Sequence, residues 1–300
     1  MKSLAAIKNQ VQHEKKQIVS LANAADREVL TAVKYAISEE LCSFILIGDQ
    51  EEIKETAFKA ELDLTSPLIS VQHEESEPSL AAVKTVYEKQ ADILMKGNVS
   101  TKSLLKAVLN KEYGLRTGNV LSHVALFDIP NQDRLIFLTD AAMNIQPTLK
   151  EKVEIIHNAV RVAHGVGMEL PRVAAIAPVE VVNEAMSSTM DAAMLTQMQR
   201  RGQIKGCLVD GPLAFDNAVS KDAAELKGIT SDVAGKADIL LSPTIDVGNA
   251  LYKSFIYFAQ AKVAAIISGA KAPIVLTSRA DSAESKLYSL SLALVSSKSF

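Results

Sequence analysis

The chain has 300 residues, of which 48% are hydrophobic, and its 32 basic and 35 acidic side chains give a formal net charge of -3. At about 150 residues per domain this length predicts two domains, and the apolar content suffices for buried cores. Because both signs of charge are scattered, the composition argues against a nucleic-acid interface or an anionic-membrane surface, which need clustered Lys and Arg.

The hydropathy of the chain predicts a cytoplasmic protein with no membrane segment. The N-terminal run Leu4–Ile7 is too short for the apolar core of a signal peptide, and no stretch of about 18 apolar residues occurs. The two cysteines, Cys42 and Cys207, each precede an apolar run. We therefore expect buried thiols without a catalytic or disulfide role.

Short apolar runs alternate with longer helical patterns along the chain, which is typical of an α/β protein. The runs expected to form strands are 44–47, 68–71, 92–95, 120–127, 135–138, 173–176, 207–209, 239–241 and 274–276. This alternation predicts a largely parallel sheet with flanking helices. Such sheets bind ligands at the carboxyl ends of their strands, so the residues after each run are candidates for a site.

The stretch 92–109 predicts a strand, a turn and a helix. Its turn reads Lys96-Gly97-Asn98-Val99-Ser100-Thr101. The glycine permits a tight backbone turn, and the asparagine or a hydroxyl side chain can cap the helix. Free amides at the helix start, with Lys102 and Lys106 nearby, would form a phosphate or anion site. The alternative interpretation is an ordinary strand-to-helix turn with solvated lysines.

Nucleotide and zinc motifs find no support in the sequence. Gly165-Val166-Gly167 follows a helical pattern and is expected to end that helix rather than open a dinucleotide loop. Gly228 and Gly235 are too far apart for a P-loop. The five histidines show neither i,i+4 pairing nor a cysteine cluster, so no metal site is predicted.

Six motifs in order along the chain resemble those of the phosphate acetyl/butyryltransferases. They are Lys96-Gly97-Asn98-Val99-Ser100-Thr101, Thr139-Asp140-Ala141-Ala142-Met143-Asn144, Asp210-Gly211-Pro212-Leu213, Val233-Ala234-Gly235-Lys236-Ala237-Asp238, Gly248-Asn249-Ala250-Leu251-Tyr252-Lys253 and Ser278-Arg279. The resemblance extends over about 92–286, which is most of the chain. The variant at 276–282 is more similar to the butyryl branch of the family than to the acetyl branch.

The resemblance implies a two-domain α/β fold like that of the isocitrate and isopropylmalate dehydrogenases, and a homodimer. Residues 1–118 plus 271–300 would form a discontinuous first domain, and residues 119–270 would form the second. The active site would lie in the cleft between the two domains. The sequence itself marks where the chain would cross only weakly, through Gly114, Gly118, Gly269 and Pro273.

The resemblance also implies the reaction acyl-CoA + phosphate = acyl phosphate + CoA, with a butyryl or branched short-chain acyl group. Coenzyme A is then a co-substrate, and no cofactor is bound tightly. The reaction needs a cation for phosphate, help in deprotonating the thiol, and donors for the developing oxyanion. Arg279 would bind phosphate through its planar fork, and Ser278 would hydrogen-bond the reacting carbonyl or thiol. Because neither cysteine lies in an activating motif, we expect direct transfer in a ternary complex.

The remaining site residues carry over from the motifs. Substrate, phosphate and coenzyme A would contact Lys96, Gly97, Asn98, Ser100, Thr101, Asn144, Asp210, Gly211, Pro212 and Lys253. Acetyl-type relatives have an arginine at the position of Lys106. The lysine keeps the positive charge but lacks the planar fork of the guanidinium group. Those relatives also have an aspartate where this chain has Ser285. Glu284 or Asp281 would then be the general base, or each is an exposed acid on the first turn of the last helix.

Two other functions are compatible with the same fold. An NAD-dependent decarboxylating dehydrogenase would require magnesium-binding aspartates and a dinucleotide loop, and neither is visible in the sequence. A non-catalytic protein that binds coenzyme A or an anion would keep the fold without turnover. The segment 251–267 is apolar around most of its circumference, which predicts a place in a buried core or at a subunit contact.

Overall fold

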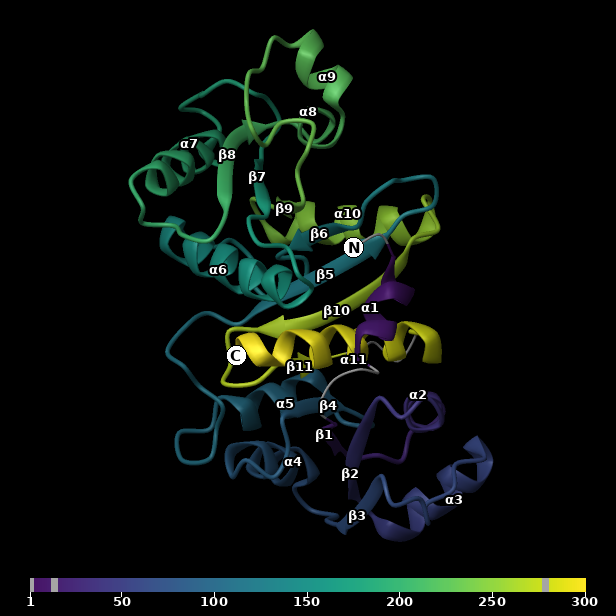
Figure 1. Cartoon of the computed structure of the whole chain (residues 1–300). Coiled ribbons are helices and arrows are strands. Elements are labelled where there is room, and N and C mark those ends of the chain that lie inside the picture. Colours follow the sequence, from purple (N-terminus) through teal and green to yellow (C-terminus); the bar gives the residue numbers. More distant parts are fainter. Residues whose placement is uncertain (1–2, 12–15, 277–280) are drawn as a thin grey trace. The chain divides into compact units, whose positions relative to one another are not determined.

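The computed structural model describes residues 3–11, 16–276 and 281–300 and confirms the α/β class (Figure 1). Its contacts divide the chain into two compact units. The middle unit consists mainly of Val120–Val263, and the terminal unit mainly of Leu4–Asn119 and Ala264–Lys298. No helix of the described residues has the length and apolar composition needed to cross a bilayer.

The terminal unit contains a mostly parallel sheet in the order β3-β2-β1-β4-β11-β10. Its strands are β1 (Gln17–Ala22), β2 (Cys42–Gly48), β3 (Ile69–His73), β4 (Ile93–Lys96), β11 (Ile274–Val275) and β10 (Lys262–Ser268), whose first two residues belong to the middle unit. All neighbours pair in parallel except β10 and β11, which are antiparallel. Every residue of the central strand β4 is buried, as expected for a parallel strand covered on both faces.

Helices of the terminal unit begin at local capping signals. The helices are α1 (Leu4–Val11), α2 (Arg27–Ser38), α3 (Gln50–Ala60), α4 (Pro78–Tyr87), α5 (Thr101–Val108) and α11 (Ala283–Ser296), followed by the 3₁₀ turn η1 (Ser297–Ser299). The side chains of Asp26 and Asp49 accept hydrogen bonds from the first turns of α2 and α3. Such caps satisfy amide groups that the helix itself leaves without a partner.

The middle unit contains strands in the order β5-β6-β9-β7-β8. They are β5 (Ser122–Asp128), β6 (Ile136–Thr139), β9 (Ile239–Leu241), β7 (Arg172–Ile176) and β8 (Leu208–Leu213). Only the β5–β6 pair of this set is antiparallel. The described helices are α6 (Leu149–Gly165), α7 (Ser187–Arg200), α8 (Phe215–Val219), α9 (Lys221–Leu226) and α10 (Ile245–Tyr257). A reciprocal capping box between Thr148 and Glu151 begins α6.

Two strands occur where no strand was predicted. The first, β1, is Gln-Ile-Val-Ser-Leu-Ala, in which polar Gln17 and Ser20 interrupt the apolar run. The second, β10, forms the end of the segment 251–267, for which the apolar pattern predicts a single helix. The helix of that segment, α10, ends at Tyr257 and buries only Gly248 and Phe255 among its residues. The expectation of a buried core is therefore correct for β10. Most of α10 is not buried within this chain, and the alternative of a subunit contact stays a prediction for it.

Glycine 97 is required by a close approach of two backbone segments. A Cβ at this position would lie 2.8 Å from the carbonyl oxygen of Ala22 and closer still to that of Asn23. The amide of Gly97 donates to the carbonyl of Ala22 at 3.0 Å, which joins the carboxyl ends of β4 and β1. Since both obstacles are backbone atoms, they cannot rotate away from a side chain.

We predict that Gly97→Ala lowers the free energy of unfolding by about 1 to 3 kcal/mol, the range typical of overpacking. Urea denaturation followed by circular dichroism measures the change. The matched control is Gly228→Asn, because a Cβ at Gly228 meets nothing within 4 Å and its φ of +66° suits asparagine. Equal stability of Gly97→Ala and the parent chain would contradict the close approach.

Candidate functional site

The turn between β4 and α5 has the predicted strand, turn and helix geometry. Ser100 is the N-cap of α5, and its side chain accepts a hydrogen bond from the amide of Ser103 at 3.0 Å. Thr101 is the first, exposed residue of the helix. Lys96 ends β4 and is only 6% exposed, and its Nζ donates to the carbonyl of Gly97 at 3.2 Å. The ammonium of Lys96 therefore stays beside the turn rather than in bulk solvent.

Asn23 is a part of this turn that the sequence pattern missed. It follows β1 with a left-handed φ of 54°, and its Nδ2 donates to the carbonyl of Asn98 at 3.0 Å. The amide of Asn98 in turn donates to the carbonyl of Asn23 at 2.7 Å. The backbone of Asn98 is thus engaged in the scaffold. The sequence did not indicate Asn23 because the strand before it, β1, was not predicted. The residue type was the available signal, since Asn adopts the left-handed conformation more readily than other residues except glycine.

Lys106 lies at the end of α5 and is exposed. It lines a small groove of about 210 Å³ between α5 and the start of α4. Ser103 and Ser79 also line the groove, and their hydroxyl oxygens are 3.1 Å apart. The groove therefore offers one mobile cation and two hydroxyl groups to a ligand of the terminal unit.

The loop Thr139–Asn144 is organised around the buried carboxylate of Asp140. This side chain accepts hydrogen bonds from the amides of Ala142 at 2.8 Å, Met143 at 3.0 Å and Asn144 at 3.2 Å. Asn144 Nδ2 donates to the same carboxylate at 2.6 Å and to the carbonyl of Leu121 at 2.9 Å. Both amide protons of the Asn144 side chain are therefore used inside the protein. Its remaining polar atom is an acceptor, which does not suit phosphate.

The motif Asp210-Gly211-Pro212 lies within strand β8 instead of following it. The sequence pattern ended the strand at Val209, whereas β8 continues to Leu213. A Cβ on Gly211 would lie 2.8 Å from the carbonyl oxygen of Ala175, so this glycine permits close pairing with the segment of β7. Lys253 is an exposed residue of α10.

Ser278 and Arg279 lie outside the described residues. The described chain resumes at Asp281, and Ser282 caps α11 by accepting a hydrogen bond from the amide of Ser285 at 3.2 Å. Glu284 is exposed on the first turn, where it accepts a hydrogen bond from the hydroxyl of Tyr288 at 3.1 Å. That exposure agrees with either role that the sequence left open for Glu284.

Lys286 is a buried cation that the sequence pattern did not identify. It is 1% exposed although it lies near the start of α11, where the helix dipole disfavours positive charge. Its ammonium donates to the backbone carbonyl of Asp281. Lys286 therefore stabilises the chain two residues after Arg279. The helical spacing to Leu290 offered a signal, because both residues share one helix face.

Asp49, His73 and Glu75 are the described side chains that bring ligand-type atoms together, all within 4.8 Å of one another. Existing hydrogen bonds already account for this cluster. Asp49 caps α3, and the amide of Gln50 donates to His73 Nδ1 at 3.3 Å. A neutral His73 then carries its proton on Nε2, which faces Glu75 at 3.4 Å. Metal binding through Nε2 would require this arrangement to break.

Neither cysteine is prepared for nucleophilic catalysis. Cys207 is 2% exposed, and burial raises the pKa of its thiol to about 12. Burial also raises the pKa of the Cys42 thiol far above its ordinary value. Because the thiolate is the reactive species, both residues remain protonated near neutral pH.

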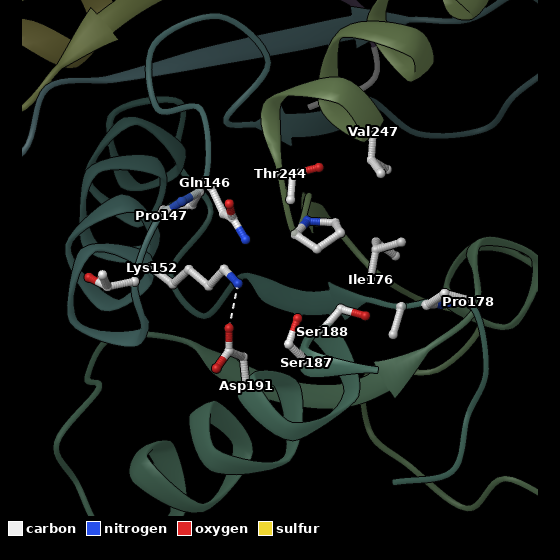
Figure 2. A pocket seen from close by; sticks show the side chains of 13 residues that line it. Gln146, Pro147, Lys152, Ile176, Pro178, Ser187, Ser188, Asp191, Thr244 and Val247 are labelled. Atoms are coloured by element: carbon white, nitrogen blue, oxygen red, sulfur yellow. Dashed lines mark hydrogen bonds and ion pairs between the residues drawn. The ribbon is translucent and has the colours of Figure 1, made fainter. Parts of the chain in front are cut away.

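The middle unit contains a pocket of about 650 Å³, here called the Lys152 pocket (Figure 2). It lies after the carboxyl ends of β7 and β9, where α/β sheets bind ligands. Its lining consists of Gln146, Pro147, Thr148, Lys152, Ile176, Ala177, Pro178, Ser187, Ser188, Asp191, Pro243, Thr244 and Val247. None of the predicted site residues is in this lining, so the sequence pattern missed the pocket.

A buried ion pair lies at the pocket wall. Lys152 Nζ and Asp191 Oδ2 are 2.6 Å apart, and the lysine side chain is only 7% exposed. Figure 2 shows the lysine extending from α6 into the pocket, with Gln146 and Thr244 on the other side of its ammonium. Within the described part of the chain, Asp191 is the only hydrogen-bonding partner of this ammonium. Two of its three N–H donors remain for a ligand.

Comparison with known proteins connects these features to one family. A family model described as Phosphate acetyl/butaryl transferase matches residues 3–80 and 66–294. The chain is 55% identical over 292 residues to a probable phosphate butyryltransferase of Bacillus subtilis (strain 168), with 95% of each chain covered. Among solved structures, a branched-chain phosphotransacylase from Enterococcus faecalis V583 is 37% identical with a TM-score of 0.81, covering 94% of this chain and 99% of that one.

A more distant structure bears on the fold alone. The 4-hydroxythreonine-4-phosphate dehydrogenase from Klebsiella pneumoniae matches with a TM-score of 0.56 at 12% identity, over 94% of this chain and 100% of that one. This likeness confirms the expectation of a dehydrogenase-like α/β fold. At this identity it carries no information about activity.

Proposed function

Because the chain belongs to the phosphate acetyl/butyryltransferase family, we propose that it is a phosphate acyltransferase of the butyryl branch. The reaction is acyl-CoA + phosphate = acyl phosphate + CoA, with coenzyme A as co-substrate. The observation that carries this proposal is the 55% identity to a probable phosphate butyryltransferase over 95% of both chains. We infer in addition that the working form is a cytoplasmic homodimer, as the family resemblance implies.

The chemistry proceeds by direct attack of phosphate on the thioester carbonyl in a ternary complex. A phosphate oxygen forms the new bond to the carbonyl carbon, and the thiolate of coenzyme A leaves with the electron pair of the broken bond. In the reverse direction a base takes the thiol proton before sulfur attacks the acyl phosphate. The high thiol pKa values of both cysteines support transfer without an acyl-enzyme.

Arg279 holds the phosphate and Ser278 hydrogen-bonds the reacting carbonyl or sulfur. The planar guanidinium matches two phosphate oxygens at once, and a hydroxyl donor stabilises charge that develops on oxygen. Lys106 adds positive charge from the terminal unit, and Glu284 or Asp281 serves as the base.

The proposal predicts that the protein converts short-chain acyl-CoA and phosphate without a metal ion or a nicotinamide cofactor. Purified protein with butyryl-CoA and phosphate is expected to release free thiol, measured with a chromogenic disulfide, in the presence of a metal chelator. Isobutyryl-CoA and acetyl-CoA define the acyl preference, for which one methylene contributes about 1 to 3 kcal/mol. Oxidation of a hydroxy acid with NAD would instead favour the dehydrogenase, and binding of coenzyme A without turnover would favour a sensor.

Arg279→Ala is expected to lower kcat/KM for phosphate about 100- to 1,000-fold, because the preorganised positive charge that binds the phosphate is lost. Arg279→Lys keeps the charge and loses the fork, so its kcat/KM for phosphate should lie between those of Arg279→Ala and the parent chain. The matched control is Arg200→Ala, an exposed arginine at the end of α7. A rate unchanged by Arg279→Ala would remove the proposed phosphate ligand.

Cys42→Ala and Cys207→Ala are expected to retain kcat within about twofold, because neither thiol forms a thiolate near neutral pH. Mass spectrometry of the enzyme quenched during turnover should detect no acylated protein. A burst of thiol release together with an acyl adduct on either cysteine would contradict direct transfer.

A further inference from the structure

The Lys152 pocket balances its charges internally. Its cation is paired with Asp191 at 2.6 Å. Two of the helices that begin at the pocket have an acid in their first turn, Glu151 in α6 and Asp246 in α10. Glu151 also occupies the N-terminus of α6 through the capping box with Thr148. Neither acid lines the cavity, but both place negative charge at helix starts beside it, so a strongly anionic ligand such as a diphosphate would gain little from one neutralised cation.

Hydrogen-bonding groups nevertheless surround the cavity. Lys152 has two N–H donors left, and the carboxylate of Asp191 has further acceptor capacity. The side chains of Gln146, Ser188 and Thr244 line the same space, and no protein partner binds their polar atoms within the described residues. Gln146 is exposed and Ser188 and Thr244 are half-buried, so these polar atoms are accessible to a ligand that enters the cavity.

Apolar surface completes the lining. Pro178, Ile176 and Val247 lie among the polar groups around the same cavity (Figure 2). Pro243 also belongs to the lining. The volume of about 650 Å³ is within the range of pockets that enclose a ligand of moderate size. The ligand that fits this lining is uncharged, carries amide or hydroxyl groups, and has a branched apolar part.

We propose that the Lys152 pocket binds the pantetheine arm of coenzyme A. This inference rests on the proposed function, which supplies coenzyme A as the ligand. The pantetheine arm is uncharged, has two amides and a hydroxyl group, and carries a pair of methyl groups. Lys152 donates to a carbonyl of the arm, and Asp191 accepts from an amide N–H or the hydroxyl. The methyl pair contacts Ile176 and Val247, while the charged nucleotide part of coenzyme A stays outside the pocket.

Pantetheine itself is the probe that separates this pocket from the phosphate site. With the full-length chain, reduced pantetheine is expected to inhibit competitively against butyryl-CoA and not against phosphate. Lys152→Met removes the donors, and Ser188→Leu fills the cavity from α7 without touching the ion pair. Each variant should raise the inhibition constant of pantetheine and the KM for butyryl-CoA about tenfold or more, with the KM for phosphate within about twofold.

Two controls keep the result interpretable. Lys150→Met removes an exposed lysine of the same helix outside the lining and should leave every constant unchanged. Removing one partner of a buried pair destabilises a fold, so Lys152→Met with Asp191→Leu removes both charges together. Circular dichroism verifies that each variant is folded. Folded variants with unchanged inhibition by pantetheine would overturn the assignment, as would competition of pantetheine with phosphate.

Failure of the pocket and failure of the proposed function are distinguishable. Turnover of butyryl-CoA that is insensitive to Ser188→Leu and Lys152→Met would keep the function and remove the pocket assignment. If the parent chain shows no turnover, calorimetric titration with pantetheine tests the pocket directly. Binding that is lost in Ser188→Leu would then support the pocket while the enzymatic proposal fails, and absence of binding would overturn the pocket as well.

Discussion

Direct contact of backbone with backbone is the constraint on which the candidate site depends. Gly97 lies against the carbonyl groups of Ala22 and Asn23 in the terminal unit. In the middle unit, Gly248 lies against the carbonyl of Asp140, with the Ser242 hydroxyl 2.7 Å from where a Cβ would be. Each of these glycines belongs to a motif of the family. Their absent side chains bring a loop and a neighbouring element close enough to exchange hydrogen bonds, which positions the loops at the carboxyl ends of the strands.

Many polar groups of the same motifs form hydrogen bonds within the protein. The carboxylate of Asp140 accepts from three amides of its own loop and from the Asn144 side chain. Ser242 donates to the carbonyl of Asp140 at 2.6 Å, and Asn98 exchanges backbone and side-chain bonds with Asn23. A motif can therefore identify a family through its scaffold. The groups that remain for a ligand are mostly cations and hydroxyls beside the motifs, such as Lys106 and Ser103.

The sequence predicted local geometry well and long-range geometry poorly. The β4–α5 turn followed from an apolar run, one glycine and a capping serine, all of which act within a few residues. Strand β1 was missed because Gln17 and Ser20 are tolerated only through tertiary contacts, Ser20 with the carbonyl of Ala82 at 3.1 Å. Lys152 was missed because its partner Asp191 is 39 residues away. Its helical spacing to the buried Ile155 and Ile156 was the available signal.

Two ammonium groups, those of Lys152 and Lys286, are buried, and the free-energy cost of burying each charge must be offset by its partners. Burial removes water from each charge. Replacement of a whole buried ion pair by well-packed apolar residues is commonly neutral or stabilising, whereas loss of one partner alone is destabilising. A fold that gained nothing else from these positions would be expected to lose them. Lys286 holds the carbonyl of Asp281, close in sequence to Arg279, and Lys152 extends into a cavity with donors to spare. A buried cation that keeps donors free beside a cavity, as at Lys152, is the pattern expected where binding contributes to the choice of residue.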